Sequence, residues 1–200
     1  MIGKSVLVFQ FKITLEGIKP PIWRRIQVPA DYSFWDLHVA IQDAMGWDDY
    51  HLHEFKILDP NIQTTLRIGI PDEDFDCSQE MLAGWDVYIS DYFNEKNPLA
   101  TYIYDFGDGW THRIRLEKIE SLLPDRNYPL CLSGKRACPP EDVGGIWGYE
   151  NFLDIIRDPK HEEHERMLEW VNGGYDPENF ETGKVEFSDP NERWKFAFLE

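Results

Sequence analysis

The sequence predicts a single α+β domain, residues 1–200, whose mixed sheet is built around a β-grasp-like N-terminal part. Three observations support this prediction: strand patterns alternate early with one amphipathic helix, a later pair of strand patterns flanks an Asp-Gly turn, and two helical patterns follow near the C-terminus. The 200 residues are 42% apolar and 14% aromatic, which is enough to bury one core.

The first sixty residues are expected to run strand, strand, helix, strand. Apolar and polar residues alternate over 9–15, and a second strand is expected over 22–28. Ser33 provides an N-cap for an amphipathic helix that ends at Gly46, and residues 51–58 indicate a third strand. This order resembles the β-grasp arrangement, in which a hairpin and a later strand form one sheet across which the helix packs.

The later elements have weaker patterns. We expect short strands over 64–70 and 85–90 around an acidic loop over 71–76, and then a hairpin of strands over 99–104 and 111–119. A Pro-, Gly- and Cys-rich stretch over 123–148 is expected to be irregular. Helices should follow over 149–157 and 161–171, with a final strand or docking segment within 186–198.

The charge of the chain argues against nucleic-acid binding. The formal net charge is -17, from 37 acidic and 20 basic residues. Such a chain repels a phosphate backbone unless its cations gather on one face, and the basic clusters at 23–25, 113–115 and 135–136 are short. Nucleic acid is therefore an unfavoured partner.

Cysteine content and hydropathy predict a cytoplasmic protein. Cys77, Cys131 and Cys138 are an odd number of thiols, and residues 1–8 lead into a strand pattern without a charged-then-apolar leader. No apolar run approaches the roughly 20 residues that span a bilayer. We expect free thiols and no membrane insertion.

The segment 104–112 contains more polar side chains than a hairpin turn requires. Asp108-Gly109 is sufficient to explain the turn. Asp105, the Asp108 carboxylate and His112 remain, and their side chains could meet at one end of the sheet. The turn therefore predicts part of a site.

Two more histidines could complete a metal site. His51 and His53 stand two apart in an expected strand, so both would point to one face and could donate two nitrogens to one metal. His112 shares its register with buried apolar positions. We predict His51, His53 and His112 as ligands of a divalent metal such as zinc; the alternative is hydrogen-bonded histidines at the end of a strand.

The two thiols of the 131–145 stretch have six residues between them, which does not match the spacing of structural zinc sites. They could form a reversible disulfide, or one of them could be a thiolate whose pKa is lowered by Lys135 and Arg136. The alternative is two small buried residues that pack an irregular loop.

Arg24 interrupts the apolar register of its strand, so its guanidinium would point inward and need a carboxylate. Asp105 or Asp108 could supply it, as a structural salt bridge or as a substrate anchor. The alternative is that the other face of the strand, with Trp23, is the buried one.

Four motifs together resemble the family of plasmid open-reading-frame-three proteins. The family is named after a reading frame on a root-inducing plasmid. Some members carry the label of insertion-element passenger proteins of the TnpR type. The motifs are 21–25, 46–47 with 51–55, 104–110 with His112, and 138–145 with 148–149. The resemblance covers about residues 5–180 and implies one α+β domain in which the motifs converge. Thr111 departs from the family pattern, in which an acidic residue usually stands beside the histidine.

The function that we predict is binding of a small ligand or metal ion in a His/Asp/Glu/Cys-lined pocket, with hydrolysis as its candidate reaction. Its candidate catalytic residues are His112, Asp105, Glu141 and Asp142; its candidate ligand-binding residues are Arg24, Asp108, Arg136 and Cys138. One alternative is a non-catalytic module that docks a protein partner through exposed tryptophans such as Trp47 or Trp85. A less favoured one is a mobile-element accessory that acts on DNA.

Overall fold

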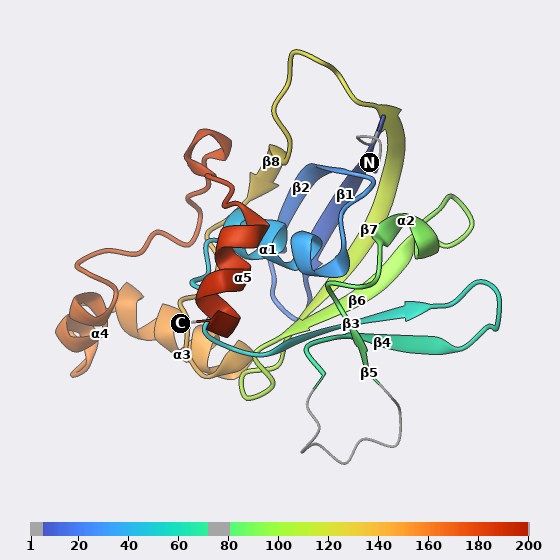
Figure 1. Cartoon of the computed structure of the whole chain (residues 1–200). Coiled ribbons are helices and arrows are strands. Elements are labelled where there is room, and N and C mark those ends of the chain that lie inside the picture. Colours follow the sequence, from blue (N-terminus) through green and yellow to red (C-terminus); the bar gives the residue numbers. More distant parts are fainter. Residues whose placement is uncertain (1–5, 72–80, 200) are drawn as a thin grey trace.

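A computed structural model describes residues 6–71 and 81–199, and one eight-stranded sheet runs through this part of the chain (Figure 1). The strand order is β5-β4-β3-β6-β7-β1-β2-β8, and every neighbouring pair is antiparallel except β4 and β5. The elements are β1 (Leu7–Leu15), β2 (Ile22–Pro29), α1 (Phe34–Met45), β3 (His53–Leu58), β4 (Thr65–Gly69), β5 (Met81–Ala83), α2 (Ile89–Tyr92), β6 (Leu99–Tyr104), β7 (Trp110–Ser121), β8 (Leu130–Lys135), α3 (Gly145–Arg157), α4 (His164–Trp170), the 3-10 helix η1 (Thr182–Lys184) and α5 (Pro190–Leu199).

The N-terminal part has the predicted strand, strand, helix, strand order. β1 and β2 pair as a hairpin, and β3 lies in the same sheet, with β6 and β7 between it and the hairpin. Ser33 and Asp36 form a capping box at the start of α1, and Gly46 ends the helix in the left-handed conformation. The α+β prediction is confirmed.

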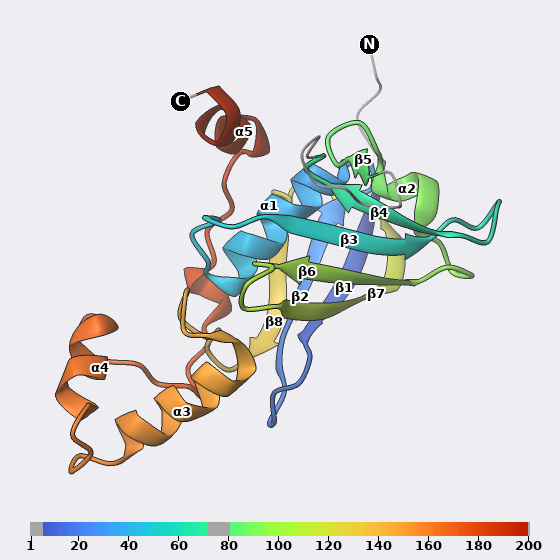
Figure 2. The same cartoon turned by 90° about the horizontal axis from the view of Figure 1, so that it is seen from below.

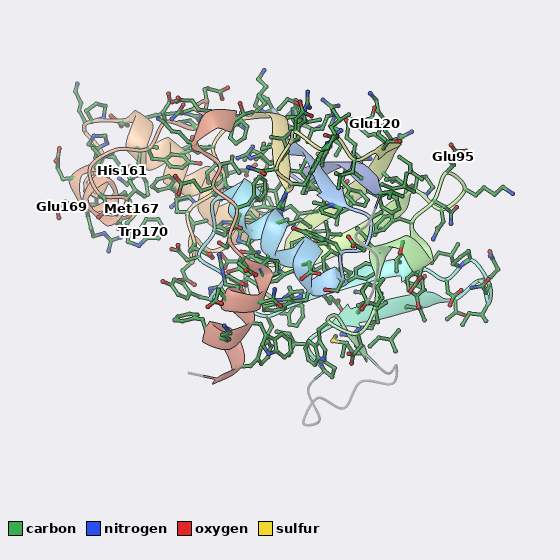
Figure 3. The ribbon with its side chains drawn as sticks, turned by 45° about the horizontal axis from the view of Figure 1, so that its top comes forward. Glu95, Glu120, His161, Met167, Glu169 and Trp170 are labelled. Atoms are coloured by element: carbon green, nitrogen blue, oxygen red, sulfur yellow. The ribbon has the colours of Figure 1, made fainter. Side chains whose placement is uncertain are left out.

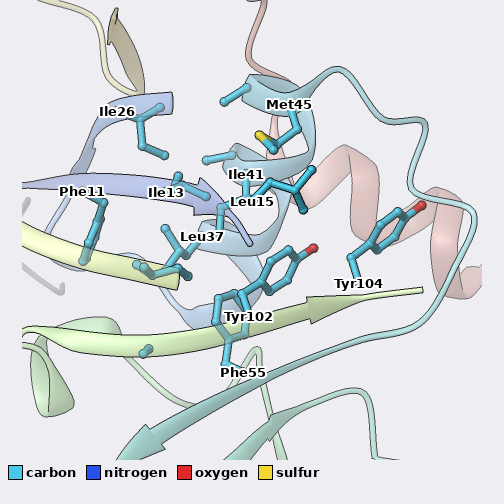
Figure 4. Packing of buried hydrophobic residues seen from close by; sticks show 14 of the residues in the cluster. Phe11, Ile13, Leu15, Ile26, Leu37, Ile41, Met45, Phe55, Tyr102 and Tyr104 are labelled. Atoms are coloured by element: carbon cyan, nitrogen blue, oxygen red, sulfur yellow. The ribbon is translucent and has the colours of Figure 1, made fainter. Parts of the chain in front are cut away.

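The core lies between one face of the sheet and α1. In Figure 4, side chains from β1, β3 and β6 point toward Leu37, Ile41 and Met45 of the helix. In Figure 2, α1 and α5 lie above β7, β1 and β2 and on the same side of these strands. Strand residues that face α1 are buried and their neighbours in sequence are more exposed, because side chains alternate across a sheet.

Several boundaries differ from the sequence prediction. Residues 85–90 do not form the expected strand: a turn is followed by an isolated β-bridge from Tyr88 to Ser33, and α2 begins at Ile89. The stretch expected to be irregular contains β8 as the edge partner of β2. The C-terminal segment is a helix, α5. Most of the predicted acidic loop lies outside the described residues, as does Cys77.

One boundary matters for the site: β3 begins at His53, so His51 precedes the strand. The helices α3 and α4 lie at the end of the sheet where β3 starts and β6 ends (Figure 1). Among the described residues, no helix is long and apolar enough to cross a bilayer.

Candidate functional site at the end of the sheet

The turn between β6 and β7 is shaped by Asp105. This residue has a left-handed backbone (φ 54°), and its Oδ1 accepts a hydrogen bond from the Gly107 N–H at 2.9 Å. Its own N–H donates to the Leu52 carbonyl at 2.9 Å, which ties the turn to the segment just before β3. Asp105 Oδ2 is thereby left facing that segment, toward His51.

The same turn packs against the start of α3. Asp108 Oδ2 accepts a hydrogen bond from the Gly144 N–H at 3.0 Å. Gly145 lies so close that a Cβ there would be 2.6 Å from the Asp108 carbonyl oxygen, and its φ is +67°. These contacts explain the two adjacent glycines, and they bring the 139–144 segment to the turn. The Asp108 carboxylate, predicted as a ligand-binding group, is bonded to the backbone here.

His51, Asp105 and Asp142 meet where these segments join. His51 Nε2 lies 3.0 Å from Asp142 Oδ1 and 3.7 Å from Asp105 Oδ2. One ligand atom from each residue lies within 4.8 Å of the others. His51 Nε2 is a buried atom that makes no hydrogen bond of good geometry within the described chain, so the two carboxylates approach it without satisfying it.

Glu141 lies beside these three residues. Its Oε1 accepts hydrogen bonds from the Asp48 N–H at 2.9 Å and from the Tyr104 hydroxyl at 3.0 Å. Its Oε2 is buried and finds no partner in the part of the chain that the structure describes. Burial raises the pKa of the Glu141 carboxyl, and the Asp48 and Tyr104 hydrogen bonds oppose that rise. We call His51, Asp105, Glu141 and Asp142 the sheet-end cluster.

The other two predicted histidine ligands lie in the core instead. His112 is fully buried, and its Nδ1 hydrogen-bonds the Trp110 carbonyl at 3.1 Å. Burial lowers the pKa of His112 to about 3. His53 is 2% exposed, and burial lowers its pKa well below the usual range, with the neighbouring His38 adding to the shift.

The expected set of three histidine ligands does not assemble among the described residues. His53 and His112 lie on β3 and β7, with β6 between them, so their backbones are on the order of 10 Å apart. His51 lies outside β3 and does not share the face of His53 as the strand prediction required. The residues that accompany His51 are carboxylates: Asp105, Glu141 and Asp142, all predicted as site residues.

Arg24 is buried as predicted, but its partners are not carboxylates. Its Nε donates to the Ala44 carbonyl at 2.8 Å, and NH1 donates to the Trp23 and Lys135 carbonyls at 2.9 and 3.2 Å. The guanidinium also lies 3.8 Å from the ring centroid of Phe180. Arg24 therefore links α1 to β2 and β8.

Arg136 and Cys138, predicted as ligand-binding residues, are also engaged in contacts within the fold. Arg136 is 2% exposed, and it donates to Glu178 and to the Pro20 carbonyl, both at 2.7 Å. Cys131 and Cys138 are free thiols, and burial raises the pKa of each, the opposite of the lowering expected for a reactive thiolate. The packing alternative fits these thiols.

A buried polar network on α1 was not predicted from the sequence. Gln42 donates to the Tyr102 hydroxyl at 2.8 Å, and His38 Nδ1 contacts the same hydroxyl at 2.8 Å. His38 Nε2 contacts Asp49 Oδ1 at 2.8 Å, and the His38 ring stacks on His53 at 3.4 Å. The available signal was two polar residues four apart, His38 and Gln42, on the apolar side of the helix.

A groove of about 690 Å³ lies beside the sheet-end cluster and shares His51 with it. Its walls come from the segment 47–52 and from the C-terminal residues 188–198. They combine aromatic rings with carboxylates, and their cation, Arg193, lies 2.9 Å from Asp43 and 3.5 Å from Asp49. The groove therefore favours a neutral or cationic ligand.

The tryptophans proposed for docking a partner are not free surfaces. Trp47 is 4% exposed and donates from its indole nitrogen to the Pro139 carbonyl at 3.0 Å. Trp85 packs edge-to-face on Trp194 with ring centroids 4.6 Å apart. Trp47 is also one of the residues that line the groove.

Comparisons with known proteins agree with the family resemblance of these motifs. The family model described as "Plasmid pRiA4b ORF-3-like protein" matches residues 7–184. The chain belongs to this family. The chain is also 34% identical to "Uncharacterized protein y4hQ" of Sinorhizobium fredii. That alignment runs over 185 residues and covers 92% of this chain and 89% of that protein.

A solved structure has the same fold. The crystal structure of "Protein of Unknown Function MM3350" from Methanosarcina mazei Go1 matches with a TM-score of 0.85 and 44% identity, over 92% of this chain and 99% of that one. The family assignment predicted from the motifs is confirmed. Neither relative's name states an activity, so the function must be argued from the site.

Proposed function

We propose that this ORF-3-like protein binds one divalent metal ion in the sheet-end cluster and hydrolyses a small neutral or cationic compound held in the adjacent groove. The observation that carries the proposal is His51 Nε2: a buried nitrogen without a hydrogen-bond partner among the described residues, approached by two carboxylates at 3.0 and 3.7 Å. An imidazole nitrogen and carboxylate oxygens are common ligands of zinc and similar ions.

The distances support a metal of ordinary bond length. Bonds of about 2.1 Å in tetrahedral geometry separate neighbouring ligand atoms by about 3.4 Å. The two distances from His51 Nε2, 3.0 and 3.7 Å, fall on either side of that value. Three protein ligands with a fourth position open is the pattern of catalytic rather than structural zinc sites.

Glu141 is the candidate general base. When bound, a divalent metal would lower the pKa of a coordinated water and polarise the bond to be cleaved. Glu141 Oε2 is free to accept a proton because the contacts to Asp48 and Tyr104 use only Oε1. Burial raises its pKa above that of an exposed glutamate, which makes the carboxylate a stronger base. Asp105 and Asp142 would serve as ligands.

The metal is tested first. Calorimetric titration of apoprotein with Zn²⁺, Mn²⁺ and Co²⁺ should give one site, and the Co²⁺ protein should show visible d–d absorption. His51→Ala should weaken binding at least 100-fold. The matched control is His161→Ala, because His161 is exposed and lies at the α4 end of the molecule (Figure 3). Equal binding by both variants would contradict the site.

Hydrolysis is tested separately with a neutral ester, 4-nitrophenyl acetate. We expect release of nitrophenolate by the metal-loaded protein above the rate of free metal. Glu141→Gln should retain the metal and lose at least tenfold in rate. A metal-loaded protein with no rate above background, or a Glu141→Gln variant of unchanged rate, would limit the proposal to metal binding.

A further inference from the structure

The sheet has a second face, opposite α1, on which cations gather. Lys12 of β1 lies directly opposite Arg25 of β2 and Arg115 of β7, so all three side chains emerge on one side. Arg113 emerges on the same side, two residues before Arg115 and opposite Thr14. The basic clusters at 23–25 and 113–115, far apart in sequence, therefore become neighbours.

These cations line a groove of about 840 Å³. Lys12, Arg25, Arg113, Arg115 and Lys118 contribute five positive charges to it, and Glu117 contributes one negative charge, for a formal charge of +4. The whole chain carries -17. We call these six residues with Gln10, Thr14 and Trp23 the basic sheet face.

The cations are only partly neutralised. Glu117 accepts from Arg25 at 2.6 and 3.0 Å, Glu16 lies 3.4 Å from Arg113, and Glu120 lies 3.7 Å from Lys118. Within the described residues, Lys12 and Arg115 have no carboxylate at ion-pair distance. Like charges opposite one another destabilise a sheet, so this arrangement has a cost that an anionic partner would remove.

An aromatic ring stands among the cations. Trp23 is partly exposed, and Lys12 Nζ and the Arg25 guanidinium lie 5.0 and 5.2 Å from its ring centroid. Lys12 is at the end of a long flexible side chain and can move from the ring to a phosphate, whereas Arg25 is held by Glu117 and Ser133. The ring then offers a surface on which a base can stack.

We propose that the basic sheet face binds single-stranded nucleic acid. A cationic groove on a sheet, next to an aromatic side chain, is the combination that holds backbone phosphates while a base stacks. An acidic protein partner would use the charges but not the ring. The proposal is independent of the metal site, because the face lies on the side of the sheet opposite α1. The net charge of -17 disfavours nucleic acid only if the cations are dispersed over the surface, and here five of them gather on one face of the sheet.

The test is fluorescence anisotropy with a labelled 12-nucleotide oligothymidine, at 25 to 200 mM NaCl. We expect micromolar affinity at low salt and a slope of log K against log salt of about -3, for four neutralised phosphates. The double variant Lys12→Glu with Arg115→Glu should lose at least tenfold and give a shallower slope. The matched control reverses Arg157 and Lys160 to glutamate at the exposed end of α3 and should leave binding unchanged.

Trp23→Leu separates stacking from charge and should weaken binding about tenfold without a change in slope. Circular dichroism melting must show each variant folded. Three results would overturn the proposal: no binding at 25 mM salt, equal competition by a polyglutamate peptide of the same charge, or equal affinity for a 12-base-pair duplex. The first would leave the face unassigned; the second and third would assign it to an acidic protein or to duplex DNA.

Discussion

His51 and His53 are two residues apart and lie in opposite surroundings. His53 is the first residue of β3, is 2% exposed, and its ring stacks on His38. The His51 side chain is 28% exposed, and two carboxylates lie near its nitrogen. The start of β3 divides them. The imidazole of His53, at the first position of the strand, is part of the core. The imidazole of His51, just before the strand, faces the turns that carry Asp105 and Asp142.

The largest expected effect is acid sensitivity of the core histidines. The folded-state pKa values of His53 and His112 are lowered below the value of about 6.5 in the unfolded chain. The unfolded state therefore binds more protons than the folded state as pH falls from that value toward 3. The stabilisation is complete above pH 6.5 and is lost on acidification. For His112 alone the loss is about 2 kcal/mol between pH 7.5 and 5, and His53 adds a loss in the same direction.

Urea unfolding of the wild type and of His53→Gln with His112→Gln, at each pH, would measure this loss. The double variant should be less stable at pH 7.5 but should lose at least about 2 kcal/mol less on acidification, which is the share of His112 alone. The difference isolates the two histidines because the other titrating groups are shared. Parallel pH curves would show that the core histidines are not held neutral.

A smaller effect is expected where the turn meets α3. Alanine at Gly145 or at Gly173 must adopt a positive φ, which costs roughly 1–2 kcal/mol. Only Gly145→Ala also places a Cβ 2.6 Å from the Asp108 carbonyl; at Gly173 nothing lies within 4 Å. We expect a loss of about 3 kcal/mol for Gly145→Ala and about 1 for Gly173→Ala by thermal unfolding.

Metal titration of the same two variants links packing to the site. Displacement of the turn moves Asp105, so Gly145→Ala should weaken metal binding, whereas Gly173→Ala should bind as the wild type does. If both variants lose equal stability, the close approach of α3 does not constrain the turn.

The smallest effect on stability is expected at Asp142. Its side chain is 70% exposed, and asparagine tolerates the left-handed backbone at this position (φ 54°). Asp142→Asn should change the free energy of unfolding by no more than about 0.5 kcal/mol. It should still weaken Zn²⁺ binding at least tenfold, measured by calorimetry. A stability loss above about 1 kcal/mol would mean that the carboxylate has a structural role.

Local patterns predicted most of the sheet and the main helix. The alternation over 9–15, the capping residue Ser33 and the Asp108-Gly109 turn each act through neighbours in sequence, and the structure contains all three. Asp105, Glu141 and Asp142 were predicted as site residues because carboxylates in Gly-rich turns have no packing explanation, and the structure brings them together around His51.

The rest depended on contacts distant in sequence. Whether His51 pairs with His53 or with Asp142 was decided by the first residue of β3, which a pattern locates only to within a few residues. The partners of Arg24 are carbonyl oxygens of α1, β2 and β8, and no local pattern indicates them. The basic sheet face needed the register of β7 on β1.

Helix α5 has a consequence for how ligand choice could vary. Asp43 receives hydrogen bonds from Ser188 and Arg193, and Trp35 donates to the Pro190 carbonyl, so the C-terminal segment is fixed on α1. This segment forms one wall of the groove, yet the family match ends at residue 184. The wall formed by residues 188–198 therefore lies beyond the part of the chain that the family model matches. We expect replacement of this segment to change which compounds reach His51 and to leave Asp105, Glu141 and Asp142 in place.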